Sequence, residues 1–221
     1  MLVLALDTAT ARITVGVVEL GADGPPVTLA ARVGVGARAH AELLAPAVRD
    51  ALAEAGRTRR DLDAVVVGLG PGPFTGLRVG LVTAAAMGDG LGLPVHGVPT
   101  HDAMAVGRPG RVLVATDARR REVYWSLVVD GVRTHGPEVT APTELAARVE
   151  AGDPAVDVVL GDAADRVGGT GDEVPGPDPD GLVAVAAPVL RAGTAPGPLV
   201  PLYLRRPDAV PPGAPKAVTR P

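Results

Sequence analysis

The chain has 221 residues, of which 47% are hydrophobic and 21% are charged, so it has enough apolar side chains for a buried core. Its net charge of −4, its four aromatic residues and its lack of Asn and Gln argue against direct nucleic-acid binding, and the absence of Cys excludes disulfides, thiolate metal sites and Cys nucleophiles. No apolar run approaches the roughly 20 residues of a membrane span, and no basic segment precedes the first apolar residues, so we expect a cytoplasmic protein without membrane contact.

The first half of the chain predicts an α/β layered domain over residues 1–107. Apolar runs of strand length alternate with stretches whose apolar residues recur at helical spacing, and glycines such as Gly56 end them. The predicted elements are strands at 2–6, 13–18 and 27–35, a helix at 40–55, a strand at 63–69, a helix at 75–87 and a strand at 95–98. A hairpin followed by alternating strands and helices is typical of this fold class.

A composition shift at residues 106–110 predicts the boundary of a second α/β domain over residues 108–206. Its predicted elements are strands at 112–116 and 122–129, a short helix opening at 141–144, a strand at 156–160 and a helix at 182–191. Acidic residues, Gly and Pro are frequent between 150 and 180, which predicts a mostly solvated loop. Residues 207–221 are rich in Pro and lack apolar periodicity, so we expect a disordered and dispensable tail.

The glycine-rich segment at residues 68–78 is the strongest local signal for a binding site. It joins a buried strand to a helix start, where glycine permits close backbone approach and free N–H groups favour an anion. Pro71 and Pro73 lack an N–H, so the loop has fewer donors than a phosphate-binding P-loop. The alternative is a tight strand-to-helix connection whose glycines serve packing alone. The candidate anion contacts are Asp7, Thr8, Gly72, Thr75, Gly76 and Arg78, and Thr75 is placed to cap the helix.

The helix predicted after this loop is apolar nearly all round. Between Thr75 and Gly92 its only charged residues are Arg78 and Asp89, and many of the others are Gly or Ala. Such a helix must be buried on more than one side, either between elements of its own chain or against a partner. The residues alone leave both alternatives open.

Few side chains are suited to catalysis. Ser126 and Lys216 are the only serine and lysine, so a serine hydrolase and a Schiff-base enzyme would each depend on one residue. Leu44 lies four residues after His40, where a second zinc ligand would be needed, and the other histidines show no ligand spacing. We therefore predict no metal site and no peptidase activity.

Five short segments, in the same order along the chain, resemble the TsaB (YeaZ) family. They are Leu4–Ala9, His40–Pro46, Gly70–Arg78, Asp117–Tyr124 and Pro201–Arg205. Each motif alone is weak, but five in order over nearly the whole chain are specific. The chain departs from the family pattern at Ala41 and Pro73, where the family usually has Ser, and at Arg120 and Arg121, where it often has Met and Gly.

This resemblance implies the two-domain α/β fold of the actin, Hsp70 and sugar-kinase (ASKHA) superfamily. It also implies a non-catalytic scaffold subunit that binds and activates TsaD, which transfers a threonylcarbamoyl group to the tRNA adenosine next to the anticodon. The ATPase TsaE is implied as a third component. We expect the chain alone to bind no cofactor, with ATP and a metal entering through its partners, and we expect tRNA to reach it only within the complex.

The resemblance also favours a partner interface on the first two helices, because members of the family pair through them. A homodimer through the same helices is an alternative use of that surface. The implied interface residues are His40, Leu44, Val48, Leu77, Leu81, Ala84 and Ala85.

Two other functions stay open. In the superfamily an Asp after the first strand helps to bind the metal of a nucleotide, so Asp7, Asp117 and the Gly72 loop would serve an autonomous kinase or ATPase. For Asp7 we favour the simpler role of capping its turn by accepting nearby N–H groups. A homodimeric structural protein unrelated to tRNA is the third alternative.

Overall fold

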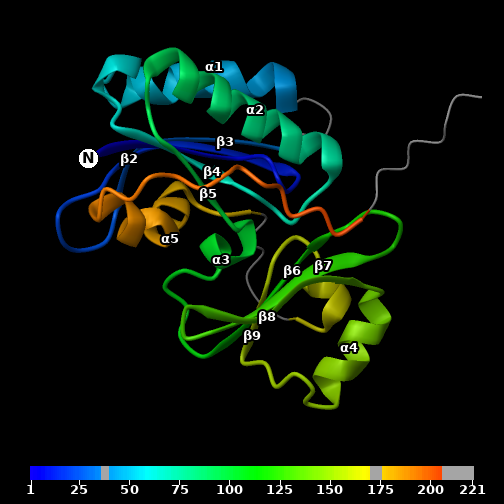
Figure 1. The fold of residues 1–221 in the computed structure, drawn as a ribbon. Helices are drawn as coiled ribbons and strands as arrows, with labels where there is room; N and C mark the ends of the chain where they lie inside the picture. The colour runs from blue at the N-terminus through cyan, green and yellow to red at the C-terminus, as the bar shows by residue number, and fades with distance from the viewer. Residues whose placement is uncertain (36–39, 170–175, 206–221) are drawn as a thin grey trace, which may run out of the picture.

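The computed structural model describes residues 1–35, 40–169 and 176–205, which form two α/β lobes (Figure 1). The first lobe is built on a five-stranded sheet with the order β3-β2-β1-β4-β5. Its strands are β1 (Leu2–Asp7), β2 (Arg12–Glu19), β3 (Val27–Val35), β4 (Ala64–Gly68) and β5 (Val95–Val98). The first three strands are joined as antiparallel hairpins, whereas β4 and β5 run parallel to β1, as strands connected through helices do.

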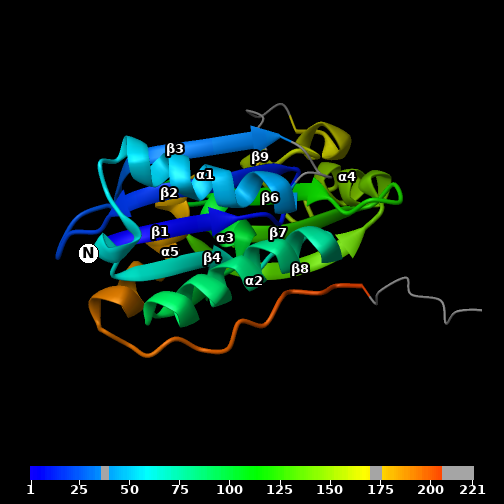
Figure 2. The same cartoon turned by 90° about the horizontal axis from the view of Figure 1, so that it is seen from above.

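Helices cover both faces of this sheet (Figure 1). One face carries α1 (His40–Glu54) and α2 (Phe74–Leu91), and the other carries α3 (Thr100–Met104) and α5 (Pro179–Arg191). Seen from above, α1 and α2 lie side by side over the sheet (Figure 2). Gly56 and Gly92, just past the ends of these two helices, have φ values of 64° and 68°, which glycine adopts without steric cost.

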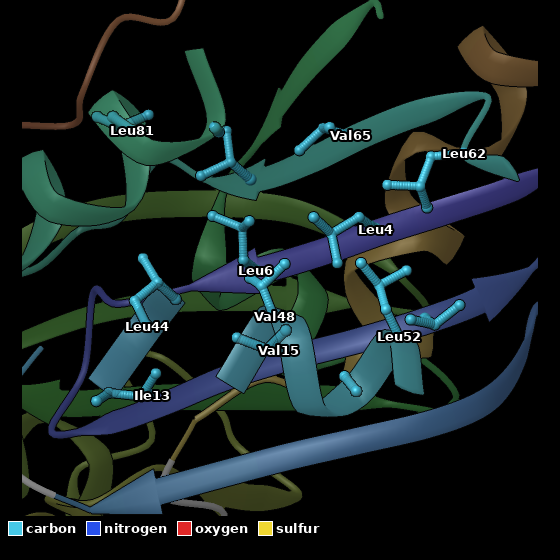
Figure 3. Close-up of a cluster of buried hydrophobic side chains, with 14 residues drawn as sticks. Leu4, Leu6, Ile13, Val15, Leu44, Val48, Leu52, Leu62, Val65 and Leu81 are labelled. Carbon is cyan, nitrogen blue, oxygen red and sulfur yellow. The ribbon is translucent and has the colours of Figure 1, made fainter. Parts of the chain in front are cut away.

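The side of α1 and α2 that faces the sheet supplies the main apolar core of the first lobe. Leu44, Val48 and Leu81 are only 1%, 6% and 7% exposed. They point toward strand residues such as Leu4, Leu6 and Val15 (Figure 3). Burial of apolar area stabilises a fold by about 25 cal/mol per Å². These side chains therefore determine which face of each helix turns toward the sheet.

The second lobe contains a four-stranded sheet with the order β8-β7-β6-β9. Its elements are β6 (Arg111–Asp117), β7 (Val123–Val129), β8 (Val132–Thr140), α4 (Pro142–Glu150) and β9 (Val158–Leu160). Short 3-10 turns occur at Arg59–Asp61 in the first lobe and at Ala164–Val167 in the second. None of the helices in the described ranges combines the length and the hydropathy that a membrane span requires.

The α/β class is confirmed, and three expectations need correction. Helix α5 lies within the range assigned to a C-terminal domain, 108–206, but it packs on the first sheet, because Leu182, Val183 and Leu190 complete a core with β1 and β4. Strand β8 was not predicted, because its polar, exposed residues lack an apolar alternation. The second helix extends beyond residue 87 to Leu91. The tail at 207–221 and residues 170–175 of the acidic loop lie outside the described residues.

Helix α3 joins the two lobes through a buried histidine. His101 is fully buried, with Nδ1 2.9 Å from Ser126 Oγ and Nε2 2.9 Å from Thr116 Oγ1, both on strands of the second sheet. Burial, together with the positive charge of Arg133, lowers the pKa of His101 to about 3. The ring is therefore neutral and donates one hydrogen bond while accepting the other. The only serine of the chain is thus used in packing between the lobes.

Acid should weaken this junction. The folded pKa of His101, about 3, is below the ordinary value of 6.5, so the unfolded chain binds a proton more readily and stability falls as the pH drops below 6.5. Between pH 7.5 and pH 5 this loss amounts to about 2 kcal/mol. We expect the difference in unfolding free energy between the native chain and His101→Gln to shrink by that amount over this range in urea titrations. A difference that stays constant with pH would show that His101 is not buried in its neutral form.

Candidate functional site

Asp7, which occupies the place of the superfamily's nucleotide-site Asp, is completely buried at the end of β1. Its Oδ1 accepts a hydrogen bond from the backbone N–H of Ala9 at 2.8 Å, and its Oδ2 accepts one from the Thr100 hydroxyl at 2.6 Å. Thr100 Oγ1 in turn accepts from the N–H of Gly70 at 3.1 Å. A Cβ at Gly68 would lie 1.7 Å from Asp7 Oδ2, so only glycine fits beside this carboxylate. The turn-capping bond that we favoured for Asp7 is present.

Burial raises the pKa of Asp7 to about 6, although its two hydrogen bonds oppose the shift. Because the folded pKa lies above the ordinary 3.8, keeping the carboxylate ionised costs the folded state about 3 kcal/mol at high pH, and this cost disappears as the pH falls from 6 to 4. Asp7 therefore holds the β1 turn to the loop that follows β4 at a cost in stability.

Replacing Asp7 by Asn removes the buried charge and keeps an oxygen for the Ala9 N–H. As the pH rises from 4.5 to 8, we expect the unfolding free energy of the variant to increase by about 2 kcal/mol relative to that of the native chain. Denaturant titrations at the two pH values measure this gain. If the unfolding free energies of the two proteins change equally with pH, the pKa of Asp7 is not raised.

Packing requires glycine at Gly72 in the 68–78 segment and at Gly80 just after it. Thr8 Oγ1 donates to the carbonyl of Gly76 at 2.7 Å and accepts from the N–H of Gly80 at 3.0 Å, which places the Thr8 hydroxyl against the α2 backbone. A Cβ at Gly80 would lie 2.5 Å from that hydroxyl, and a Cβ at Gly72 would lie 2.1 Å from the carbonyl oxygen of Ala9. These contacts support the packing alternative for the loop.

The candidate anion contacts come together in part at the turn after β1, but they differ in exposure. Asp7, Thr8, Gly72 and Gly76 are buried, whereas Thr75 and Arg78 are exposed. The prediction that Thr75 caps α2 is wrong, because the helix already begins at Phe74 and its N-cap position is Pro73, which has no side-chain donor or acceptor.

Arg78 is held by two aromatic residues. Its Nε donates to the Tyr203 hydroxyl at 3.1 Å, and its guanidinium lies 3.8 Å from the centre of the Phe74 ring. The Phe74 and Tyr203 rings are themselves 5.0 Å apart. Tyr203 is 125 residues from Arg78 in the sequence, so no local signal pointed to this cluster.

A small pocket of about 150 Å³ lies between the lobes beside this cluster. It is lined by Gly72, Pro73, Phe74, Ala118, Arg119, Arg120, Tyr124, Tyr203, Leu204 and Arg205. The nearby Asp117 carboxylate is neutralised by Arg166 at 2.8 Å, with Arg119 at 3.9 Å. With Asp7 buried and Asp117 paired, the carboxylates required by the autonomous kinase alternative are occupied by contacts within the chain.

The residues assigned to a partner interface are mostly core residues, which corrects that prediction. Leu44, Val48, Leu77, Leu81 and Ala84 are 7% exposed or less. Four of them, Leu77 being the exception, belong to the core cluster between the helices and the sheet. Ala85 is half-buried and lines a shallow hollow with Leu199. The side chain of His40 lies outside the described residues.

An apolar groove lies between the same two helices. It has a volume of about 490 Å³ and is lined by Ala45, Val48, Arg49, Leu52, Ala53, Arg57, Thr58, Arg59, Thr83 and Met87. Leu43 on α1 and Val82 on α2 are 41% and 66% exposed on these helices. Of the interface residues named from the sequence whose side chains the structure describes, Val48 alone also lines this groove.

Comparisons with known proteins agree with one another. The model of the family described as TsaD, tRNA N6-adenosine threonylcarbamoyltransferase, matches residues 34–168. An uncharacterized protein of Mycobacterium leprae is 50% identical to this chain, and the match covers 95% of this chain and 56% of that protein. The tRNA threonylcarbamoyladenosine biosynthesis protein TsaB of Escherichia coli is 40% identical, and that match covers 57% of this chain and 54% of the relative. The chain thus spans about half the length of these two relatives. The structure of YeaZ from Pseudomonas aeruginosa is similar with a TM-score of 0.70 and 27% identity, covering 92% of this chain and 99% of that one.

Proposed function

Because the chain belongs to the TsaB (YeaZ) family and has its ASKHA-type fold, we propose that it is a non-catalytic subunit that binds and activates a TsaD-type partner. The partner would transfer a threonylcarbamoyl group to the tRNA adenosine next to the anticodon. Relatives named TsaB are biosynthesis proteins of this modification, which supports the proposal.

The observation that carries this proposal is the apolar groove between α1 and α2. Its lining includes Val48 and Leu52 of α1 and Met87 of α2, which also contact the core on the sheet, and Leu43 and Val82 are exposed on the same helices outside this lining. An apolar groove together with exposed apolar side chains on the same two helices fits a protein interface. Arg49, Arg57 and Arg59 at its border supply the polar rim that such interfaces have.

The relation between this chain and the transferase suggests how the two would pair. One family model describes the transferase and also matches 34–168 of this chain, which includes both groove helices. Two proteins with a common domain can associate through equivalent helices in a nearly two-fold arrangement. In the absence of the partner, two copies of this chain would use the same surface.

Nucleotide binding, metal binding and catalysis would then belong to the partners. The buried Asp7, the paired Asp117 and the buried Ser126 are held in contacts that maintain the fold. ATP and a metal would enter through the TsaD-type and TsaE-type components, and tRNA would meet this chain only within the complex.

A depletion experiment tests the proposal. Switching off production of the chain in cells should lower the threonylcarbamoyladenosine content of tRNA, measured by mass spectrometry of tRNA nucleosides, and resupplying the native chain should restore it. The purified chain incubated alone with tRNA, threonine, bicarbonate and ATP should produce none. Unchanged modification after depletion would contradict the assignment to this process, and modification by the pure chain would contradict a non-catalytic role.

A further inference from the structure

Three consecutive arginines form the turn between β6 and β7, residues 118–122, which we call the arginine turn. Arg119, Arg120 and Arg121 are all exposed, and their φ values are 62°, 53° and 63°. Residues other than glycine rarely adopt this left-handed region, because their Cβ approaches a backbone carbonyl oxygen. The turn is closed by two backbone hydrogen bonds of 3.0 Å, from the Ala118 N–H to the Glu122 carbonyl and from the Glu122 N–H to the Arg119 carbonyl. Glycine would form it at a lower steric cost, so folding alone does not account for three arginines here.

The carboxylates beside the arginine turn are paired with arginines from other segments. Asp117 accepts from Arg166 at 2.8 Å, and Glu122 forms an ion pair with Arg205. In the part of the chain that the structure describes, Arg121 forms no ion pair. The turn therefore has an excess of positive charge, although the net charge of the whole chain is −4.

Two aromatic side chains lie beside the arginine turn. Phe74 and Tyr203 line the same inter-lobe pocket as Arg119 and Arg120. Tyr203 is 38% exposed, and Arg78, which is also exposed, donates to its hydroxyl. The C-terminal segment that carries Tyr203 ends next to the second lobe (Figure 1). Exposed guanidinium groups next to an exposed aromatic ring are typical of surfaces that bind single-stranded nucleic acid.

The pocket at the centre of this surface is too small for a whole nucleotide. Its volume is about 150 Å³, whereas pockets that enclose a small-molecule ligand usually have about 300–1,000 Å³. It has room for one phosphate group, and the rest of such a ligand would extend over the exposed arginines and Tyr203. A strand with successive phosphates fits this shape better than a free nucleotide.

We propose that the arginine turn and Tyr203 bind a single-stranded segment of RNA. Phosphates of the strand contact Arg119 and Arg121, and a base stacks on the exposed ring of Tyr203. This inference rests on the proposed function, in which the RNA is the tRNA that the complex modifies. It adds a direct contact between this chain and the tRNA, and that surface shares no lining residue with the α1/α2 groove.

Removing two charges from the arginine turn tests the phosphate contacts. For Arg119→Gln with Arg121→Gln, we expect the assembled complex with a TsaD-type protein to bind an unmodified tRNA transcript at least tenfold more weakly. Fluorescence anisotropy of the labelled transcript measures this affinity. The slope of log affinity against log salt concentration should become shallower by about 1.4, because each contact to a single strand contributes about 0.7.

A matched control removes the same charge elsewhere. Arg60 and Arg108 are exposed, and Arg108 precedes β6 whereas the arginine turn follows it. Arg60→Gln with Arg108→Gln should leave both the tRNA affinity and the salt slope at their native values. An equal loss in this control would show a general effect of net charge and would overturn the assignment to the turn.

Two further substitutions separate binding from folding. Arg121→Gly places glycine at a φ of 63°, so the melting temperature should stay the same or rise while the tRNA affinity falls. A lower melting temperature with unchanged affinity would show that Arg121 serves the fold, and would overturn its role in binding. Tyr203→Ala should weaken binding at least fivefold and Tyr203→Phe less than twofold, because phenylalanine keeps the ring on which a base stacks. Equal affinities of these two variants would overturn the stacking contact.

The results separate this inference from the proposed function. If the complex forms and modifies tRNA but Arg119→Gln with Arg121→Gln binds tRNA as the native chain does, the RNA contact is wrong and the proposed function stands. If the chain does not bind a TsaD-type protein, the proposed function fails, and titration of the free chain with the same transcript at low salt still tests the contact. Equal binding by the free native and variant chains would overturn it.

Competition experiments identify other ligands of the same surface. ADP or inorganic phosphate that displaces the transcript, at an ionic strength where sodium chloride does not, would assign the pocket to a small anion. Polyglutamate that binds as tightly as the transcript would assign the arginine turn to an acidic protein. Either result would overturn the RNA contact.

Discussion

Replacing Ala84 by arginine is expected to unfold the first lobe. Ala84 is fully buried in α2 and belongs to the core cluster between this helix and the sheet. An arginine there would be a buried charge with no partner, which costs several kcal/mol, and the added side chain would also overpack the core. Since a whole domain is stabilised by only about 5–15 kcal/mol, circular dichroism should show loss of cooperative folding at room temperature.

Ala86→Arg is the matched control for this substitution. Ala86 lies two residues further along α2 and is exposed, so its arginine can reach water. We expect its unfolding free energy to stay within about 0.5 kcal/mol of the native value. An Ala84→Arg protein that melts like Ala86→Arg would show that α2 does not pack on the sheet through Ala84.

Replacing Val82 by arginine should abolish partner binding without affecting the fold. Val82 is 66% exposed on α2, so the free chain can solvate the new charge. In a complex that covers this exposed part of α2, the same arginine would be desolvated in an apolar contact. A cost of several kcal/mol corresponds to binding weakened at least a hundredfold. Titration calorimetry with a purified TsaD-type protein of the same organism measures this effect.

Val132→Arg is the matched control, because it also replaces an exposed valine by a charged arginine. Val132 is also 66% exposed, but it begins strand β8 of the second lobe, away from the groove helices. We expect Val132→Arg to bind the partner as the native chain does. If it loses affinity as Val82→Arg does, the partner surface includes the second lobe and the groove assignment is incomplete.

Sequence pattern predicted the order of elements well, because strands and helices with a clear apolar period fold as that period dictates. The helical stripe Leu44, Val48 and Leu52 is an example, and it faces the sheet. The faces of α2 could not be assigned in the same way, because Ala, Gly and Val occupy nearly its whole circumference. A uniformly apolar helix indicates that it is buried but not on which side.

Contacts between segments far apart in the sequence could not be predicted from local sequence patterns. Asp7 and Thr100 are separated by 93 residues, and Arg78 and Tyr203 by 125. Helix α5 was assigned to the second half because it follows that half in sequence, yet its apolar side chains complete the core of the first sheet. Tertiary packing, which a single sequence does not reveal, determined all three.

Methyl NMR of the chain titrated with its TsaD-type partner tests the docking surface most directly. Exposed methyl groups report each surface separately: Leu43 and Val82 report the α1/α2 side, Val27 and Val33 report β3, and Val132 reports the second lobe. We predict that the partner shifts or broadens the Leu43 and Val82 signals and leaves Val132 unchanged. A partner that binds while the Leu43 and Val82 signals keep their free positions would contradict docking on the exposed side of α1 and α2.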